Sequence, residues 1–282
     1  MPTRIGAAVI NRVPYGSSLL PSALLTRLIR HPRRRGLALG LMLGWYGATD
    51  SEIRHFVRWL KNSGWSKALV FNGQMLQDAW VLSRRDSQIE GFFVDVGAAY
   101  PVKYSNSYLL QQMGWNGILI DANPRLAQEL RLQRESDSVR VVEAAVSDGK
   151  GTETLLCAGP MSSLESSVNV DHLGKKRKRI STSEGRFEVT TATLDDLLKS
   201  AGAPETIDYL SIDVEGHDLT ALRSIDLTQW DVRAISVEHN FQLEQLSAMD
   251  DHLRQHDFVR VCGRWSSIDS WYVKREDLMR RT

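Results

Sequence analysis

The strongest constraint on the fold is a change in the hydrophobic pattern near residue 90, after which short apolar runs alternate with helix-like stretches. Such alternation favours parallel strands joined by helical crossovers. The last two runs are separated by a loop too short for a crossover, so we expect them to pair antiparallel. The predicted strands are 92–96, 117–120, 139–142, 209–212, 234–237, 258–262 and 270–273, and the predicted helices are 106–113, 124–133, 219–223 and 242–255.

This pattern predicts an α/β fold: a doubly wound, mostly parallel seven-stranded sheet with an antiparallel C-terminal hairpin. The residues before it lack the strand pattern. Segment 50–62 carries apolar residues at helical spacing, and prolines interrupt the first 35 residues. We therefore predict a helical N-terminal extension or cap over 1–88 and a ligand-binding α/β domain over 89–282.

Composition excludes several classes of protein. The 282 residues include 35 Lys and Arg against 34 Asp and Glu, a net charge of +1. The chain therefore has no strong overall positive charge that would attract nucleic acid. The two cysteines, Cys157 and Cys262, make neither a disulfide framework nor a zinc site. They are typical of a reducing compartment, so we predict a cytoplasmic protein without a nucleic-acid partner.

Two basic segments each allow two interpretations. Residues 30–35 are basic and precede an apolar run at 37–46, which is shorter than the roughly 20 residues needed to cross a bilayer. A buried helix is the preferred interpretation, and peripheral membrane contact is the alternative. The run 175–179 is typical of a solvated loop, and the alternative is a lid over an anionic acceptor.

Carboxylates stand at the ends of the first two predicted strands, where doubly wound sheets bind their ligands. Asp95 ends the first strand and suits a cationic ammonium group, and Gly97 lets the backbone turn sharply. Asp121 ends the second strand, where a carboxylate can accept both hydroxyls of a ribose. The alternative is that Asp95 and Gly97 only make a turn.

The loop after the first strand separates two candidate cofactors. A dinucleotide needs several glycines so that its pyrophosphate can reach a helix N-terminus. Residues 97–102 read Gly-Ala-Ala-Tyr-Pro-Val, with one glycine and one proline. This composition disfavours a pyrophosphate and suits S-adenosylmethionine, which carries no phosphate.

A series of motifs then resembles a known family. They are Val94–Ala98, Ser105–Ser107, Gly114–Pro124, Ala144–Asp148, Thr193–Leu197, Ile207–Gly216 and Val237–Asn240. Over about residues 70–275 the sequence is similar to the FkbM family of methyltransferases. The resemblance implies a class I methyltransferase fold with S-adenosylmethionine as donor, usually acting on a hydroxyl of a sugar, polyketide or other natural product. Ala99 and Pro101 depart from the family pattern, which usually has a polar residue and a glycine there.

The resemblance also implies the cofactor residues. Asp95, Gly97 and Asn106 would border the methionine end, Asp121 would hold the ribose, and residues 143–145 would border the adenine. The full predicted set is Asp95, Gly97, Ala98, Ser105, Asn106, Asp121, Ala122, Glu143, Ala144, Ala145 and Asp213.

Polar residues at the ends of the fourth and fifth predicted strands are the candidate catalytic groups: Asp213, Glu215 and His239. Methyl transfer to a hydroxyl requires an aligned acceptor and a group that takes its proton. His239 is the first candidate base, since imidazole titrates near neutral pH, and Asp213 or Glu215 could orient the acceptor or take that role. Glu215 could instead accept N–H groups of the following helix. Mg²⁺ held by Asp213, Glu238 and His239 is a further hypothesis.

We therefore predict an S-adenosylmethionine-dependent O-methyltransferase acting on a hydroxyl of a sugar, glycolipid or natural product. Two alternatives come from other classes. A nicotinamide-dependent oxidoreductase is disfavoured by the glycine-poor loop. A non-catalytic binding protein is disfavoured by the presence of Asp213, Glu215 and His239 together with Asp121. The first 88 residues are expected to shape the acceptor pocket or to form a homodimer contact.

Overall fold

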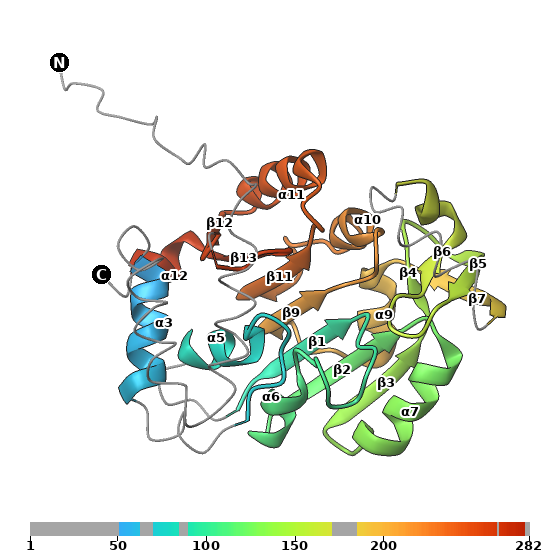
Figure 1. The fold of residues 1–282 in the computed structure, drawn as a ribbon, viewed down its shortest axis with the longest axis horizontal. Coiled ribbons are helices and arrows are strands. Elements are labelled where there is room, and N and C mark those ends of the chain that lie inside the picture. Colours follow the sequence, from blue (N-terminus) through green and yellow to red (C-terminus); the bar gives the residue numbers. More distant parts are fainter. Residues whose placement is uncertain (1–50, 63–69, 85–89, 171–184, 264, 280–282) are drawn as a thin grey trace.

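The structure is a computed structural model that describes residues 51–62, 70–84, 90–170, 185–263 and 265–279. At its centre lies a seven-stranded sheet with the strand order β12-β13-β11-β9-β1-β2-β3 (Figure 1). Neighbouring strands are parallel except for β13, which runs antiparallel to both β11 and β12. The strands are β1 Phe92–Val96, β2 Asn116–Asp121, β3 Val139–Glu143, β9 Tyr209–Ile212, β11 Ala234–Glu238, β12 Phe258–Val261 and β13 Asp269–Lys274.

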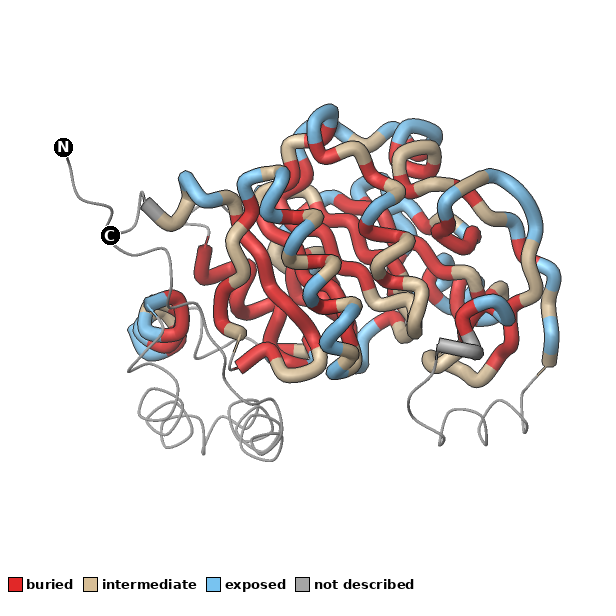
Figure 2. The backbone as a smooth tube through the Cα atoms, turned by 90° about the horizontal axis from the view of Figure 1, so that it is seen from above, coloured by how far each residue is buried: buried red, intermediate tan, exposed pale blue. Residues whose placement is uncertain are grey.

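Helices cover both faces of this sheet because its central strands are apolar on both sides. Phe93 of β1 packs in one hydrophobic core and its neighbour Val94 in another. The first core includes α3 Ser51–Asn62, α5 Gln77–Arg84, α6 Tyr108–Gln112 and α7 Pro124–Arg134. The second includes α9 Leu194–Ala201, α10 Asp218–Arg223 and α11 Leu243–Gln255. Figure 2 shows the buried strands enclosed between partly exposed helices.

Two helices of the predicted N-terminal extension belong to the same core as the sheet. The rings of Trp80 in α5 and Trp271 in β13 stack with their centroids 4.7 Å apart. The indole Nε1 of Trp265 donates a hydrogen bond of 3.1 Å to the carbonyl of Met75. These contacts tie residues 70–84 to the C-terminal strands.

Several predictions concern residues that the structure does not describe. The expected boundary at residue 88 falls within 85–89, and the segments 30–35, 37–46 and 175–179 are also outside the described ranges. Within the described ranges, every helix is too short or too polar to cross a bilayer.

The mostly parallel α/β class is confirmed, and so is the antiparallel pairing of the last two strands. The sheet details differ from the prediction because the chain forms two further sheets. A four-stranded sheet has the order β4-β7-β5-β6, and a two-stranded sheet pairs β10 with β8. Their strands are β4 Ala145–Val146, β5 Gly151–Cys157, β6 Ser163–Leu164, β7 Gly185–Ala192, β8 Thr206–Ile207 and β10 Asp231–Val232; the remaining elements are the short helices η1 Glu165–Val170 and α12 Arg275–Met279.

Candidate active site

A cavity that is open to solvent lies at the carboxyl ends of β1, β2 and β9. The ends of β1 and β2 contribute Gly97 and Asp121 to its wall, and the loop after β9 contributes Asp213 and Glu215. The small four-stranded sheet closes the opposite side with Leu155 and its neighbours. Doubly wound sheets bind ligands at this edge.

Gly97 is the point at which the loop after β1 touches the loop after β9. Its φ is +79°, and a Cβ at this position would lie 1.8 Å from the carbonyl oxygen of Asp213. Because that contact is with backbone, only glycine fits here. The Gly97 N–H donates to the carbonyl of Ile120 at 2.8 Å, which ties this loop to the end of β2 as well.

Asp121 is held by backbone on both carboxylate oxygens. The N–H of Ala99 donates to Oδ2 at 2.8 Å, and the N–H of Asn123 donates to Oδ1 at 2.8 Å. Each oxygen can accept a further hydrogen bond from a ligand in the cavity. Burial raises the pKa of Asp121 to about 6, against the opposing effect of the two N–H donors.

The remaining predicted cofactor residues fall into two groups. Ala122, Ala144 and Ala145 line the cavity with Asp121. A second group lies outside the cavity wall that the described residues form: Asp95, Ala98, Ser105, Asn106 and Glu143.

The members of this second group make contacts of their own. The Asn106 amide Nδ2 donates to Ser211 at 3.0 Å, and Asp95 accepts a hydrogen bond of 2.6 Å from Ser107. Glu143, at the surface, pairs with Arg131 at 2.8 Å. Asp95 and Asn106 therefore support the cavity from within the core.

Sequence reasoning missed the cavity wall that comes from the four-stranded sheet. Leu155 and Leu164 present apolar side chains to the cavity, and Ser162 lies beside them. Ser162 accepts a hydrogen bond of 3.1 Å from Asn123, the residue that caps α7. In the sequence, Phe187 and Val189 alternate with polar residues, a pattern that indicates the strand β7 but not the sheet to which it belongs.

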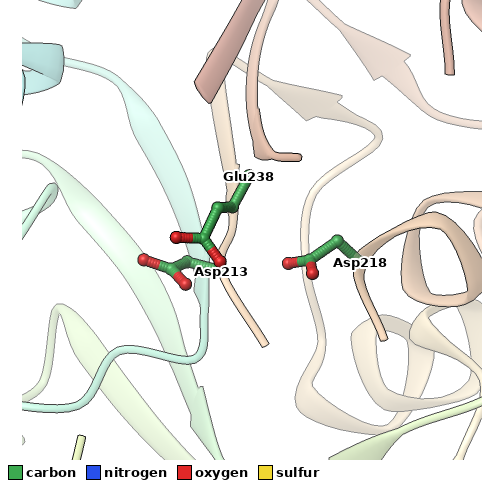
Figure 3. A group of neighbouring side chains, drawn as sticks. All are labelled: Asp213, Asp218 and Glu238. Carbon is green, nitrogen blue, oxygen red and sulfur yellow. The ribbon is translucent and has the colours of Figure 1, made fainter. Parts of the chain in front are cut away.

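Three carboxylates from separate elements meet beside the cavity. The ligand atoms of Asp213, after β9, Asp218, in α10, and Glu238, in β11, all lie within 4.8 Å of one another (Figure 3). Loss of solvation, followed by repulsion from Glu215 and Asp218, raises the pKa of Asp213 well above its usual range. Burial and the charge of Asp213 do the same for the pKa of Glu238.

Asp218 closes the loop that carries these acids. Its carboxylate accepts from the N–H of Val214 at 2.8 Å and from the N–H of Gly216 at 2.9 Å. Both N–H groups belong to the loop before α10, so Asp218 holds the turn that carries Asp213 and Glu215. Glu215 lines the cavity with a φ of +56°.

His239 is buried with both ring nitrogens engaged by backbone. Nδ1 accepts the N–H of Phe241 at 3.1 Å, so Nε2 carries the proton and donates to the carbonyl of Asp269 at 3.1 Å. Burial also lowers the pKa of His239 to about 4. This geometry does not support the predicted roles of His239 as base and metal ligand. Asp218 takes its place beside Asp213 and Glu238.

The family model described as "Methyltransferase FkbM domain" matches residues 95–260, more than half of the chain. The chain belongs to the FkbM methyltransferase family. The match begins at Asp95, so α3 and α5 of this FkbM methyltransferase precede it, and it ends within β12. No curated protein matches the chain significantly.

Two solved structures are similar to this FkbM methyltransferase. The methyltransferase FkbM from Methylobacillus flagellatus KT is 13% identical with a TM-score of 0.42, over 90% of this chain and 58% of that one. The chain thus spans 58% of the length of that relative. The METTL16 MTase domain is 13% identical with a TM-score of 0.40, over 79% of this chain and 77% of that one.

Proposed function

We propose that this methyltransferase uses S-adenosylmethionine to methylate a hydroxyl of a small sugar, glycolipid or natural product. The observation that carries the proposal is the setting of Asp121. Backbone donors fix its carboxylate at the wall of the cavity, with an acceptor position left on each oxygen.

The cavity has the chemistry that S-adenosylmethionine requires. Asp121 suits the two ribose hydroxyls, and Ala145, Leu155 and Leu164 provide apolar surface for the adenine. At the other end, Asp213 lines the wall beside which the sulfonium and ammonium groups would lie, and their positive charge would favour its ionised form. Bound there, the cofactor supplies an electrophilic methyl group.

Asp213 is our candidate base in place of His239. It lines the cavity, and its raised pKa makes it a better proton acceptor near neutral pH than an ordinary carboxylate. Glu215 lines the same wall and is positioned to orient an acceptor hydroxyl. Alignment of the acceptor with the methyl group is the other contribution that these residues make to an in-line displacement.

The dinucleotide alternative loses support for a structural reason. A pyrophosphate is bound at a helix N-terminus that follows the glycine turn directly. Here the next helix, α6, begins only at Tyr108, and residues 97–107 form a loop. The loop brings a backbone turn to the cavity without a helix N-terminus beside it.

Calorimetric titration of the purified protein with S-adenosylmethionine and, separately, with NAD tests the proposal. We expect binding of S-adenosylmethionine only. Asp121→Ala should weaken that binding at least about tenfold, since hydrogen bonds to charged groups contribute about 1.5–3 kcal/mol each.

Asp137→Ala, at an exposed carboxylate, is the control and should bind as the natural protein does. Binding of NAD, or unchanged affinity for S-adenosylmethionine in Asp121→Ala, would contradict the assignment.

A further inference from the structure

The loop after β1 holds two residues other than glycine in the left-handed region. Ala99 has a φ of +50° and Tyr104 a φ of +62°. Strained backbone of this kind persists only where surrounding contacts fix it. The first half of the loop is fixed by β2, through Gly97 and the carbonyl of Ile120. The second half needs a support of its own.

Arg134, the last residue of α7, provides that support from inside the core, where it is only 2% exposed. Its Nη1 donates to the carbonyl of Pro101 at 2.8 Å and to the hydroxyl of Ser105 at 3.2 Å. Its Nη2 donates to the hydroxyl of Ser107 at 3.3 Å, and its Nε donates to Gln111. Each guanidinium nitrogen therefore has a partner, in the fixed fork that only arginine offers.

The contact through Ser107 extends to the end of β1. The Ser107 hydroxyl donates to Asp95 Oδ2 at 2.6 Å, so it stands between a buried guanidinium and a buried carboxylate. Burial raises the pKa of Asp95, while the Ser107 hydrogen bond and the Arg134 charge lower it. The same side chain thus holds the loop and offsets a buried charge beneath the cavity.

We propose that Arg134 is a positioning residue: it holds the loop 97–107 in the conformation that binds S-adenosylmethionine. It acts through Pro101, Ser105 and Ser107. This inference rests on the proposed function, because it concerns the affinity of the same cavity for the same cofactor.

The first test compares arginine with lysine, which keeps the charge but lacks the fork. Arg134→Lys should weaken S-adenosylmethionine binding at least about tenfold in calorimetric titration. The matched control is Arg140→Lys. Arg140 Nη1 donates to the carbonyl of Ala201 at 2.6 Å, away from the loop, and its replacement should leave the affinity unchanged.

The second test isolates one hydroxyl. Ser107→Val and Ser107→Thr introduce side chains of the same shape. Only threonine keeps a hydroxyl that can accept a hydrogen bond from Arg134 and donate one to Asp95. We expect Ser107→Val to bind S-adenosylmethionine at least about fivefold more weakly than Ser107→Thr. If Arg134→Lys fails to fold, the difference in S-adenosylmethionine affinity between the two Ser107 variants decides whether the contact with Arg134 positions the loop.

A third variant separates loop geometry from general stability. Asparagine adopts left-handed backbone more readily than tyrosine. Adding Tyr104→Asn, at a half-exposed residue, to Arg134→Lys should therefore recover at least about threefold of the lost affinity.

The outcomes distinguish the two proposals. A natural protein that does not bind S-adenosylmethionine contradicts the proposed function. Suppose instead that the natural protein binds S-adenosylmethionine, that folded Arg134→Lys binds it with the same affinity, and that the two Ser107 variants also have equal affinities. This result would overturn the role of Arg134 and leave the proposed function in place.

Discussion

Gly97 lies where the loop after β1 and the loop that carries Asp213 are in close contact. An added Cβ would lie 1.8 Å from the Asp213 carbonyl oxygen, so alanine here forces one of the two loops to move. Gly97→Ala should lower the free energy of unfolding by about 2–4 kcal/mol, from left-handed strain and overpacking together. Chemical denaturation measures the loss.

Gly114 provides the control for that substitution. It also has a positive φ, +89°, but a Cβ there would meet nothing within 4 Å. Gly114→Ala should therefore show only the strain component, about 1–2 kcal/mol. Equal losses in the two variants would contradict the importance of the contact with Asp213.

The residues at strand ends also show where prediction from sequence stopped. Asp121 and Gly97 lie at the sheet edge that the sequence predicts, because each follows an apolar run and the ends of parallel strands converge there. The contacts of His239 are not predictable from the sequence, because Phe241 and Asp269 offer it backbone groups that only the folded chain brings to the ring. Asp218 was missed for the same reason, since its partners are backbone N–H groups.

At the scale of elements, the central strands were predictable and the small sheet was not. β1 and β9 are mostly apolar, and the predicted bounds of both agree with the structure to the residue. β4 and β6 have two residues each, too few for any periodicity, and β5 pairs with a strand more distant in sequence, β7. The helix α9 had readable signals, a Thr193 cap and a left-handed Gly202 at its end.

The helix α5 leads to a prediction about cooperativity. Trp80 is fully buried and stacks on Trp271 of the central sheet. Trp80→Ala should lower the free energy of unfolding by about 3–5 kcal/mol, and the protein should still unfold in one transition. Denaturant unfolding followed by far-ultraviolet circular dichroism and by tryptophan fluorescence measures both.

Trp59→Ala is the control for this substitution. Trp59 is only partly buried at the edge of the same core, so its removal should cost less. A separate early transition in Trp80→Ala would show that residues 51–84 form an independent unit.

For the whole molecule, the buried acids predict how stability depends on pH. Burial raises the pKa of Asp269 to about 7, and the pKa values of Asp213 and Glu238 lie well above their usual range. The folded chain then binds more protons than the unfolded chain, so these acids lower stability as pH rises through 7. His239, with its pKa lowered to about 4, has the opposite effect only below about pH 6.5.

The midpoint of thermal unfolding without cofactor should therefore fall between about pH 5 and 7, where the raised acids hold protons only in the folded chain and outnumber His239. Glu238→Gln removes one of the raised acids and should make the fall shallower. The exposed Glu244→Gln should leave it unchanged. A midpoint that rises over this range would contradict the account of the buried acids.

The reversed direction of β13 determines which segments of the chain meet beside the acid cluster. Because β13 runs against its neighbours, its first residue, Asp269, arrives at the edge where the parallel strands end, opposite Glu238. There it accepts a hydrogen bond from Gln77 of α5. Both Gln77 and Asp269 lie outside the stretch that matches the family, residues 95–260. The hydrogen bond between Gln77 and Asp269 thus joins the segment before the family stretch to the segment after it, beside the acid cluster.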